Sequence, residues 1–245
     1  MNILVFTSAV LLSAPATTPP TDDAITQAGR QSSREAQLTL IRAEAQTPHD
    51  NNAAMLARLS RAWADTVDTS ANPADAKKAA RHALDLAEQA VKANPKNAQA
   101  HLALAIADGK WTDFVDSQTK LALSRQIRAE AERAIALDPK LDLAYHVLGR
   151  WHLGVATVNP VFRLGARLTV GALPPASLEE AVRNLEKAAE LSPKTIIHHQ
   201  YLAVAYQALG KRNEAAQQWR IVLDLPATDS EDEKAKRQAR AALAR

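Results

Sequence analysis

Four segments of the chain end in the same way, with a helical pattern of small residues running into a proline. They read AVKANP at 90–95, AIALDP at 134–139, AAELSP at 188–193 and, more weakly, VLDLP at 222–226. A new helical pattern begins a few residues after each proline, because proline donates no backbone hydrogen bond and restricts the residue before it. A helix pair recurring at this scale predicts an all-α stack of repeats rather than a sheet.

Pro95, Pro139 and Pro193 fit the last position of a tetratricopeptide unit, in which helices A and B form a hairpin. The resemblance predicts a tetratricopeptide-like superhelical solenoid of about four helix pairs with a C-terminal capping helix. Small residues allow the helices to approach closely, and larger apolar residues fill the adjacent holes. In order of the four pairs, the predicted interior positions are Leu59, Ser60, Trp63, Ala83, Ala87 and Ala90; Leu104, Ala105, Ile127, Ala131 and Ala134; Leu148, Gly149, His152, Ala181, Leu185 and Ala188; and Ala203, Tyr206, Ala215, Trp219 and Val222.

The spacing of the prolines predicts two insertions. Pro139 follows Pro95 by 44 residues and Pro193 follows Pro139 by 54, whereas a plain unit has about 34. The first insertion, 109–124, predicts a long helix from about Asp113 to Leu137. The second, 157–176, contains an apolar run that predicts an inserted helix at 161–170. Further capping signals are Asn72-Pro73 and Gly210, with Asn213 starting a helix and Ser230 with Glu233 forming a capping box.

The first twenty residues differ in kind from the rest. Ile3–Leu12 is an apolar run about half as long as a bilayer span, and small residues at Ala14 and Ala16 suit a signal-peptidase site. We expect a signal peptide at 1–16, a Thr/Pro-rich linker at 17–23, an N-terminal helix at 24–50 and the repeat domain at 51–245. An uncleaved anchor is the alternative, because no Lys or Arg precedes the apolar run. The signal predicts an exported protein, periplasmic or extracellular in a bacterium.

Composition and motifs argue against several function classes. The chain has no cysteine, which excludes disulfides, cysteine nucleophiles and thiolate metal sites. Its net charge of +3 is too mild and too evenly spread to favour nucleic acid as a partner. The sequence has no His-Glu-x-x-His motif and no glycine-rich phosphate loop. We therefore expect a non-enzymatic protein with no catalytic residues, no bound metal and no cofactor.

The histidines and tryptophans are interpreted as structural. His198 and His199 are adjacent, so their side chains diverge by about 100° on a helix and suit one metal poorly. We interpret this pair as polar residues at a helix start, and His152 as a residue packed in the core. Core packing is also favoured over ligand stacking for the tryptophans at repeat positions, which are Trp63, Trp151 and Trp219.

The concave wall of such a solenoid is lined by positions 2, 5, 9 and 12 of each helix A. The register places mainly apolar residues there, with arginines suited to a peptide carboxylate or a lipid phosphate. The alternative is that these residues only contact the inserted helix 161–170 folded back into the groove. The predicted groove-binding residues are Arg61, Leu102, Ile106, His146, Arg150, Leu153, Gln200, Val204 and Gln207.

One combination of segments resembles the regulator of microtubule dynamics family. YHVLGRWHLGVA, the insertion, and ALPPASLEEAVRNLEKAAELSP are similar to that family's LGRW-type helix, TPPS-like turn and YEEAL-type helix ending at a proline. The closing segment YLAVAYQALGKRNEAAQQWRIVLDLPATDSEDE also resembles its last unit, so the resemblance covers about Leu56–Leu243. It implies a non-enzymatic adaptor, with tethering and lipid binding among the family's activities. Export would exclude microtubule binding.

Together these features predict a non-catalytic, exported scaffold that binds a protein or peptide segment in its concave groove. The alternative is a carrier of lipid or another apolar molecule, with the helix at 161–170 as a lid over the groove. The expected partner is a protein or peptide. Lipid binding and peripheral membrane association are further expectations, and nucleic acid is not an expected partner.

Overall fold

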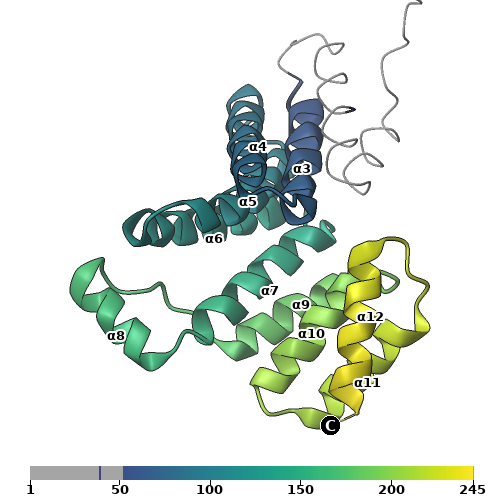
Figure 1. Ribbon diagram of the computed structural model, residues 1–245. Coiled ribbons are helices and arrows are strands. Elements are labelled where there is room, and N and C mark those ends of the chain that lie inside the picture. The colour runs from purple at the N-terminus through teal and green to yellow at the C-terminus, as the bar shows by residue number, and fades with distance from the viewer. Residues whose placement is uncertain (1–38, 40–51, 245) are drawn as a thin grey trace, which may run out of the picture.

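Stacked helix hairpins make up the part of the protein that the computed structural model describes, Thr39 and residues 52–244. The hairpins pair α3 (Ala53–Thr69) with α4 (Pro73–Ala93), α5 (Ala98–Trp111) with α6 (Ser117–Leu137), α7 (Asp142–Ala156) with α9 (Leu178–Leu191), and α10 (Ile196–Ala208) with α11 (Arg212–Asp224). The last helix, α12 (Ser230–Leu243), packs on α10 and α11 at the C-terminal end (Figure 1). The predicted all-α, tetratricopeptide-like solenoid is confirmed, since the described residues include no strand.

The three predicted prolines lie in matching turns. In each turn the residue before the proline accepts a backbone hydrogen bond from the amide two residues after it: Asn97 to Asn94 at 3.0 Å, Leu141 to Asp138 at 3.2 Å and Thr195 to Ser192 at 3.1 Å. This is the arrangement of a β-turn with proline at its second position. The next helix A follows directly, so the repeat register is the same at all three junctions.

Small residues let the helices of a hairpin approach closely. Ala79, Ala83, Ala87 and Ala90 of α4 are almost completely buried in a core that α4 shares with α3 and α5. Ser60 of α3 donates a hydrogen bond of 2.8 Å to the carbonyl of Ala83. In the third hairpin, a Cβ on Gly149 would lie 2.6 Å from Cγ of Leu185 on α9. Gly149 therefore serves packing as predicted, whereas Gly154, in the same helix, has open space around it.

The insertions differ in form. The first does not continue as one helix from Asp113, because a short 3₁₀ turn, η1 (Thr112–Phe114), precedes α6. Asp116 caps α6 by accepting hydrogen bonds from the amides of Gln118 and Thr119 at 2.9 and 3.0 Å. The second insertion contains the predicted short helix, α8 (Pro160–Thr169), with Asn159 as its N-cap.

The capping signals are mostly confirmed, with small corrections. Asn72 caps α4 through its side chain, and Gly210 ends the α10 hairpin arm with a positive φ of 79°, which glycine adopts without strain. The cap of α12 is Asp229 rather than Ser230, since its carboxylate accepts from the amides of Glu231 and Asp232. Helix α11 begins at Arg212, one residue before the predicted start.

The predicted signal peptide, linker and N-terminal helix fall on residues 1–50, which lie outside the described residues apart from Thr39. Within the described part of the chain, no helix has both the length and the apolar character needed to cross a membrane.

Candidate functional site

A cleft of about 340 Å³ lies on the side of the stack formed by the A helices. Three of these helices, α3, α5 and α7, contribute to its wall, together with two residues from the connection to α6 and from α6 itself. Its floor is apolar and its rim is charged. The lining residues are Asp68, Ala105, Ile106, Gly109, Lys110, Asp113, Ile127, Val147, Arg150 and Trp151.

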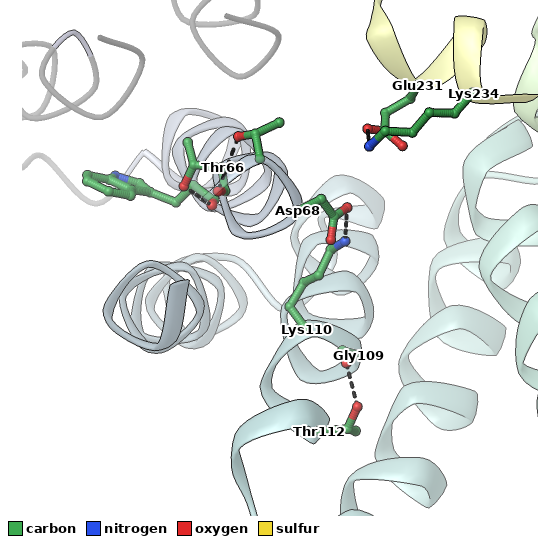
Figure 2. A network of polar contacts seen from close by, with 9 residues as sticks. Thr66, Asp68, Gly109, Lys110, Thr112, Glu231 and Lys234 are labelled. Atoms are coloured by element: carbon green, nitrogen blue, oxygen red, sulfur yellow. Dashed lines mark hydrogen bonds and ion pairs between the residues drawn. The ribbon is translucent and has the colours of Figure 1, made fainter. Parts of the chain in front are cut away.

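The rim near α3 is held by a salt bridge between Lys110 of α5 and Asp68 of α3, which Figure 2 shows pointing toward each other. Two residues after Lys110, the Thr112 hydroxyl donates a hydrogen bond of 2.6 Å to the carbonyl of Gly109, closing the C-terminal end of α5 (Figure 2). The Thr66 hydroxyl similarly donates to the carbonyl of Trp63, at 2.7 Å, within α3. The salt bridge joins the C-terminal ends of α3 and α5 where Asp68 and Lys110 line the cleft, whereas neither Thr66 nor Trp63 is among the lining residues.

The opposite rim carries Arg150 of α7, whose side chain is exposed. Its guanidinium carbon lies 4.3 Å from the ring centroid of Tyr201, a cation–π contact that orients the side chain. Behind it, the indole nitrogen of Trp151 donates a hydrogen bond of 2.7 Å to the carbonyl of Ser124. This bond ties Trp151 to α6, while the Arg150 charge faces solvent and is available to a carboxylate or phosphate.

A second, wider cavity of about 860 Å³ lies at the C-terminal end, between α10, α11 and α12. Its lining includes Trp219 at the base and two arginines at the edge, Arg212 and Arg220. Gln238 of α12 accepts a hydrogen bond from the Gln200 amide at 2.8 Å, so the capping helix is tied to α10 beside this cavity. The capping helix therefore forms one wall of the C-terminal cavity.

The structure does not bring the nine predicted groove residues together. Ile106 and Arg150 line the central cleft, and Gln207 lines the C-terminal cavity with Gln200 close by through its bond to Gln238. Arg61 is half-buried on α3, and Val204 packs partly between the core clusters of the last two hairpins. Three of the nine are buried among the helices and do not face the groove: Leu102, His146 and Leu153.

Burial of Leu102 and Leu153 follows from the way hairpins cover one another. Leu102 of α5 packs with Ala134, Leu141 and Ala144, so the following hairpin covers it completely. Leu153 of α7 belongs to the core that α9 and α10 share with it. A repeat position alone does not show how far the next hairpin overlaps the wall.

His198 and His146 form a buried pair between α10 and α7. Nε2 of His198 lies 2.8 Å from the Asp142 carboxylate, and its Nδ1 lies 3.0 Å from Nδ1 of His146. Since the carboxylate only accepts, His198 carries its proton on Nε2, and Nδ1 accepts from His146. Nε2 of His146 is then a bare acceptor with no hydrogen-bond partner among the described residues. His198 lies in the first turn of α10, as interpreted, but its side chain is buried and pairs with Asp142 and His146.

His101 and His199 occupy equivalent places in two units, each six residues after a junction proline. Each ring lies within hydrogen-bond distance of that proline's carbonyl, at 2.9 Å, and of a side chain on helix B: Glu130 at 2.5 Å for His101 and Gln218 at 2.8 Å for His199. These histidines fasten the turn to both helices. Their common offset from the prolines is the sequence signal for this role, and the adjacency of His198 and His199 concealed it.

The His146–His198 pair predicts acid sensitivity. Burial lowers the pKa of His146 well below its usual range, and burial outweighs Asp142 in lowering the pKa of His198. The unfolded chain therefore binds more protons below pH ~6.5, and stability falls as the pH drops, by up to about 1.4 kcal/mol per unit for each histidine. Urea unfolding between pH 5 and 8 tests this by comparison: the difference in unfolding free energy between His146→Phe and the natural protein should move in favour of the variant as the pH falls, because the fall is shallower in the variant. An unchanged slope in His146→Phe would contradict the assignment.

The described residues hold no group of three His, Asp or Glu side chains placed to bind a metal ion. The inserted helix α8 does not close over the central cleft either: its large apolar side chains are exposed, and it lies at the edge of the molecule (Figure 1). Helix α8 therefore forms neither a lid over the central cleft nor a segment folded back into it, the two arrangements that the sequence left open.

Fold and cleft together define the class of the protein, a tetratricopeptide-like helical-repeat protein of the kind that acts as a protein-interaction scaffold. A thermophilic tetratricopeptide-repeat protein from Thermus thermophilus has a similar structure, with a TM-score of 0.65 and 17% sequence identity over 92% of this chain and 100% of that one. This likeness concerns the fold alone.

Residues 22–245 match the family described as regulator of microtubule dynamics protein 1-3, and the chain belongs to this family. It is 29% identical to regulator of microtubule dynamics protein 2 of Mus musculus over 75% of this chain and 45% of the relative. It is 26% identical to protein 3 of Bos taurus over 86% of this chain and 44% of the relative. The chain thus spans less than half the length of these relatives.

The expectation of an exported protein is wrong. The relatives are eukaryotic proteins named as regulators of microtubule dynamics, and microtubules assemble inside cells. The apolar run that suggested export, Ile3–Leu12, lies outside the described residues. The exclusion of microtubule binding depended on export and falls with it.

Proposed function

We propose that this protein is a non-catalytic scaffold that binds a segment of a partner protein in the central cleft. The observation that carries the proposal is the position of the cleft, which is lined by the A helices of three consecutive hairpins, α3, α5 and α7. The His146–His198 pair does not favour catalysis, because both rings are buried between α7 and α10. The relatives are named as regulators of microtubule dynamics, a role that is compatible with binding a protein.

The chemistry of the cleft favours a segment with an apolar side chain next to an acidic one. Ile106 and Val147 provide an apolar floor for the first. Arg150 is the cation placed to bind the acidic side chain, since its contact with Tyr201 orients it. Lys110 on the other rim is already paired with Asp68. A carboxylate on Arg150 would gain a charge-assisted hydrogen bond in place of two bonds to water.

Charge reversal at Arg150 tests this proposal. The intact protein would be applied to immobilised twelve-residue peptides in which leucine is flanked by glutamate or, in a matched set, by lysine. We expect the glutamate set to bind and Arg150→Glu to weaken it by about 10- to 150-fold, the equivalent of 1.5–3 kcal/mol. The lysine set should gain affinity for the variant.

Arg133→Glu is the control, because Arg133 is an exposed arginine of α6 that does not line the cleft. It should bind the glutamate set as the natural protein does. Equal weakening in both variants would mean that only net charge matters, and would count against the cleft. So would strong binding of both peptide sets by all three proteins.

A lipid or other apolar small molecule is the second candidate for the same cleft. The observation in its favour is the volume of about 340 Å³ over an apolar floor, which lies within the range of small-molecule sites. Native mass spectrometry of the purified protein separates the two candidates. A co-purified molecule of lipid mass that Arg150→Glu releases would favour the second; a protein without such a mass would favour the first.

A further inference from the structure

Helix α8 exposes its large apolar side chains to solvent. Val161, Phe162, Leu164 and Leu168 are 77, 75, 59 and 77% exposed, and among the described residues they are the large hydrophobic side chains that stand out in this way. Figure 1 shows α8 at the periphery of the molecule, joined to α7 and α9 by its two connections. Four such side chains on one ten-residue helix form a contiguous apolar surface. In soluble proteins, an exposed apolar surface of this kind often marks a site that contacts another protein or a membrane.

The helix turns this apolar surface away from its own protein. At about 100° per residue, Val161, Leu164 and Leu168 fall within about 60° of one another on one face, and Phe162 lies about 100° from Val161 at the edge of that face. The half-buried residues of α8, Arg163 and Ala166, lie on the other side. Arg163 donates a hydrogen bond of 2.7 Å to the carbonyl of Val155 and so fastens the polar side of α8 to the end of α7.

The surroundings of α8 are basic. Between Asp142 and Glu179 the chain contains no acidic residue, and α8 itself carries Arg163 and Arg167 as its charged side chains. Arg125 and Arg128 of α6 reach the carbonyls of Ala172 and Pro175 in the segment that follows α8, at 3.3 and 3.5 Å. Beside the helix lies a hollow of about 420 Å³ lined by Pro160, Arg163, Leu164, Arg167, Ala172 and Leu173.

The area of the apolar surface of α8 favours a bilayer over a second protein as its binding partner. A helix of ten residues is about 15 Å long and 10 Å wide, so one face offers on the order of 150–300 Å². A specific protein interface buries about 800 Å² on each partner. A bilayer interface requires no shape complementarity, and it suits a short helix with an apolar face flanked by arginines, which lie near lipid phosphates.

We propose that α8 docks the protein on an anionic membrane surface, with Val161, Phe162, Leu164 and Leu168 inserted among the lipids and Arg167 near the phosphates. The helix lies in the plane of the interface and does not span the bilayer. This inference is independent of the central cleft, which it leaves free for a partner.

The absence of cysteine from the sequence allows a site-specific test in the full chain. Val161→Cys labelled with the environment-sensitive fluorophore NBD reports whether α8 itself enters a bilayer, even if the apolar run Ile3–Leu12 brings the chain to vesicles. We expect fluorescence to rise several-fold with phosphatidylcholine vesicles containing about 30 mol% phosphatidylserine and much less with phosphatidylcholine alone. A label at Gln126→Cys, exposed on α6, should not respond.

Two variants carrying the position-161 label separate the apolar and charged contributions. Phe162→Asp with Leu168→Asp should lower vesicle affinity at least about 10-fold, whereas Gln126→Asp with Gln217→Asp, which adds the same charge at exposed sites, should leave it nearly unchanged. Arg167→Gln keeps the apolar face and should weaken binding by a few-fold, mainly at low salt.

Three results would overturn the proposal. One is that the fluorescence of the label at position 161 does not rise with anionic vesicles. Another is that both double aspartate variants lose vesicle affinity equally. The third is a dimer of the natural protein in solution that Phe162→Asp with Leu168→Asp converts to a monomer, which would assign the surface to a second copy of the chain.

Discussion

Replacing Asp108 with asparagine is expected to remove a loss of stability that the natural protein suffers as the pH rises. Asp108 of α5 is 1% exposed, and neither of its oxygens has a hydrogen-bond partner among the described residues. Burial, with Glu130 and Glu88 nearby, raises the pKa of its carboxyl from 3.8 to about 7. In the unfolded chain this group is ionised from about pH 4 upward, so between those values the folded protein binds the extra proton.

The folded pKa lies above the unfolded one, so the stability due to Asp108 is fully present below pH ~4 and is lost as the pH rises to about 7. The shift corresponds to about 4 kcal/mol at most, or about 1.4 kcal/mol per pH unit. Asparagine has nearly the same shape and does not ionise. The difference in unfolding free energy between Asp108→Asn and the natural protein should therefore move in favour of the variant from pH 5 to 8.

Urea unfolding monitored by circular dichroism measures this difference, and comparing the two proteins cancels the opposite trend due to the histidines. Asp116→Asn is the control, because the pKa of Asp116 is shifted in the opposite direction. Asp116 caps α6, and its hydrogen bonds to Thr119 hold its pKa below the usual range. This control should lose stability instead. A constant difference between Asp108→Asn and the natural protein across the pH range would show that Asp108 is already ionised in the fold.

The second large effect is expected at Gly149. A Cβ at this position would lie 2.6 Å from Cγ of Leu185 and 3.1 Å from the carbonyl oxygen of Ala181, so α7 and α9 would have to move apart. Gly149→Val adds two more carbons in this confined space, and we expect a loss of about 3 kcal/mol. The melting temperature and the unfolding free energy both report it.

Gly154→Ala is the matched control, because Gly154 lies in the same helix and a Cβ added there would meet nothing within 4 Å. Alanine is favoured over glycine in an exposed helix interior, and we expect a gain of about 0.5–1 kcal/mol. Equal effects of the two substitutions would mean that α7 and α9 are less closely packed than the structure shows.

The fold could be predicted from the sequence because its determinants are local and repeated. Proline stops each helix B, and alanines at fixed offsets mark the faces that meet inside each hairpin. These signals lie within a few residues of one another, so the order of helix pairs follows without knowledge of distant contacts. The family resemblance agreed with this order and is confirmed by the match over residues 22–245.

The candidate site could be predicted only in part, because it depends on contacts between hairpins. His146 and His198 are 52 positions apart, and only the packing of α7 on α10 brings them together. Leu102 has the periodicity of a wall residue, yet the next hairpin covers it. The position of α8 depends on two connections that contain no repeat signal. The apolar run of α8 predicted a helix but not the direction in which it faces.

The location of the central cleft also affects how the protein comes apart. In a linear stack each hairpin contacts only its neighbours, so its melting can begin at one junction and spread from there. The cleft spans two such junctions, since α3, α5 and α7 belong to three consecutive hairpins. A ligand bound across these helices would couple the stabilities of their hairpins, and it would dissociate when one of them unfolds. Ligand binding in the cleft would thereby make the unfolding of these hairpins more cooperative.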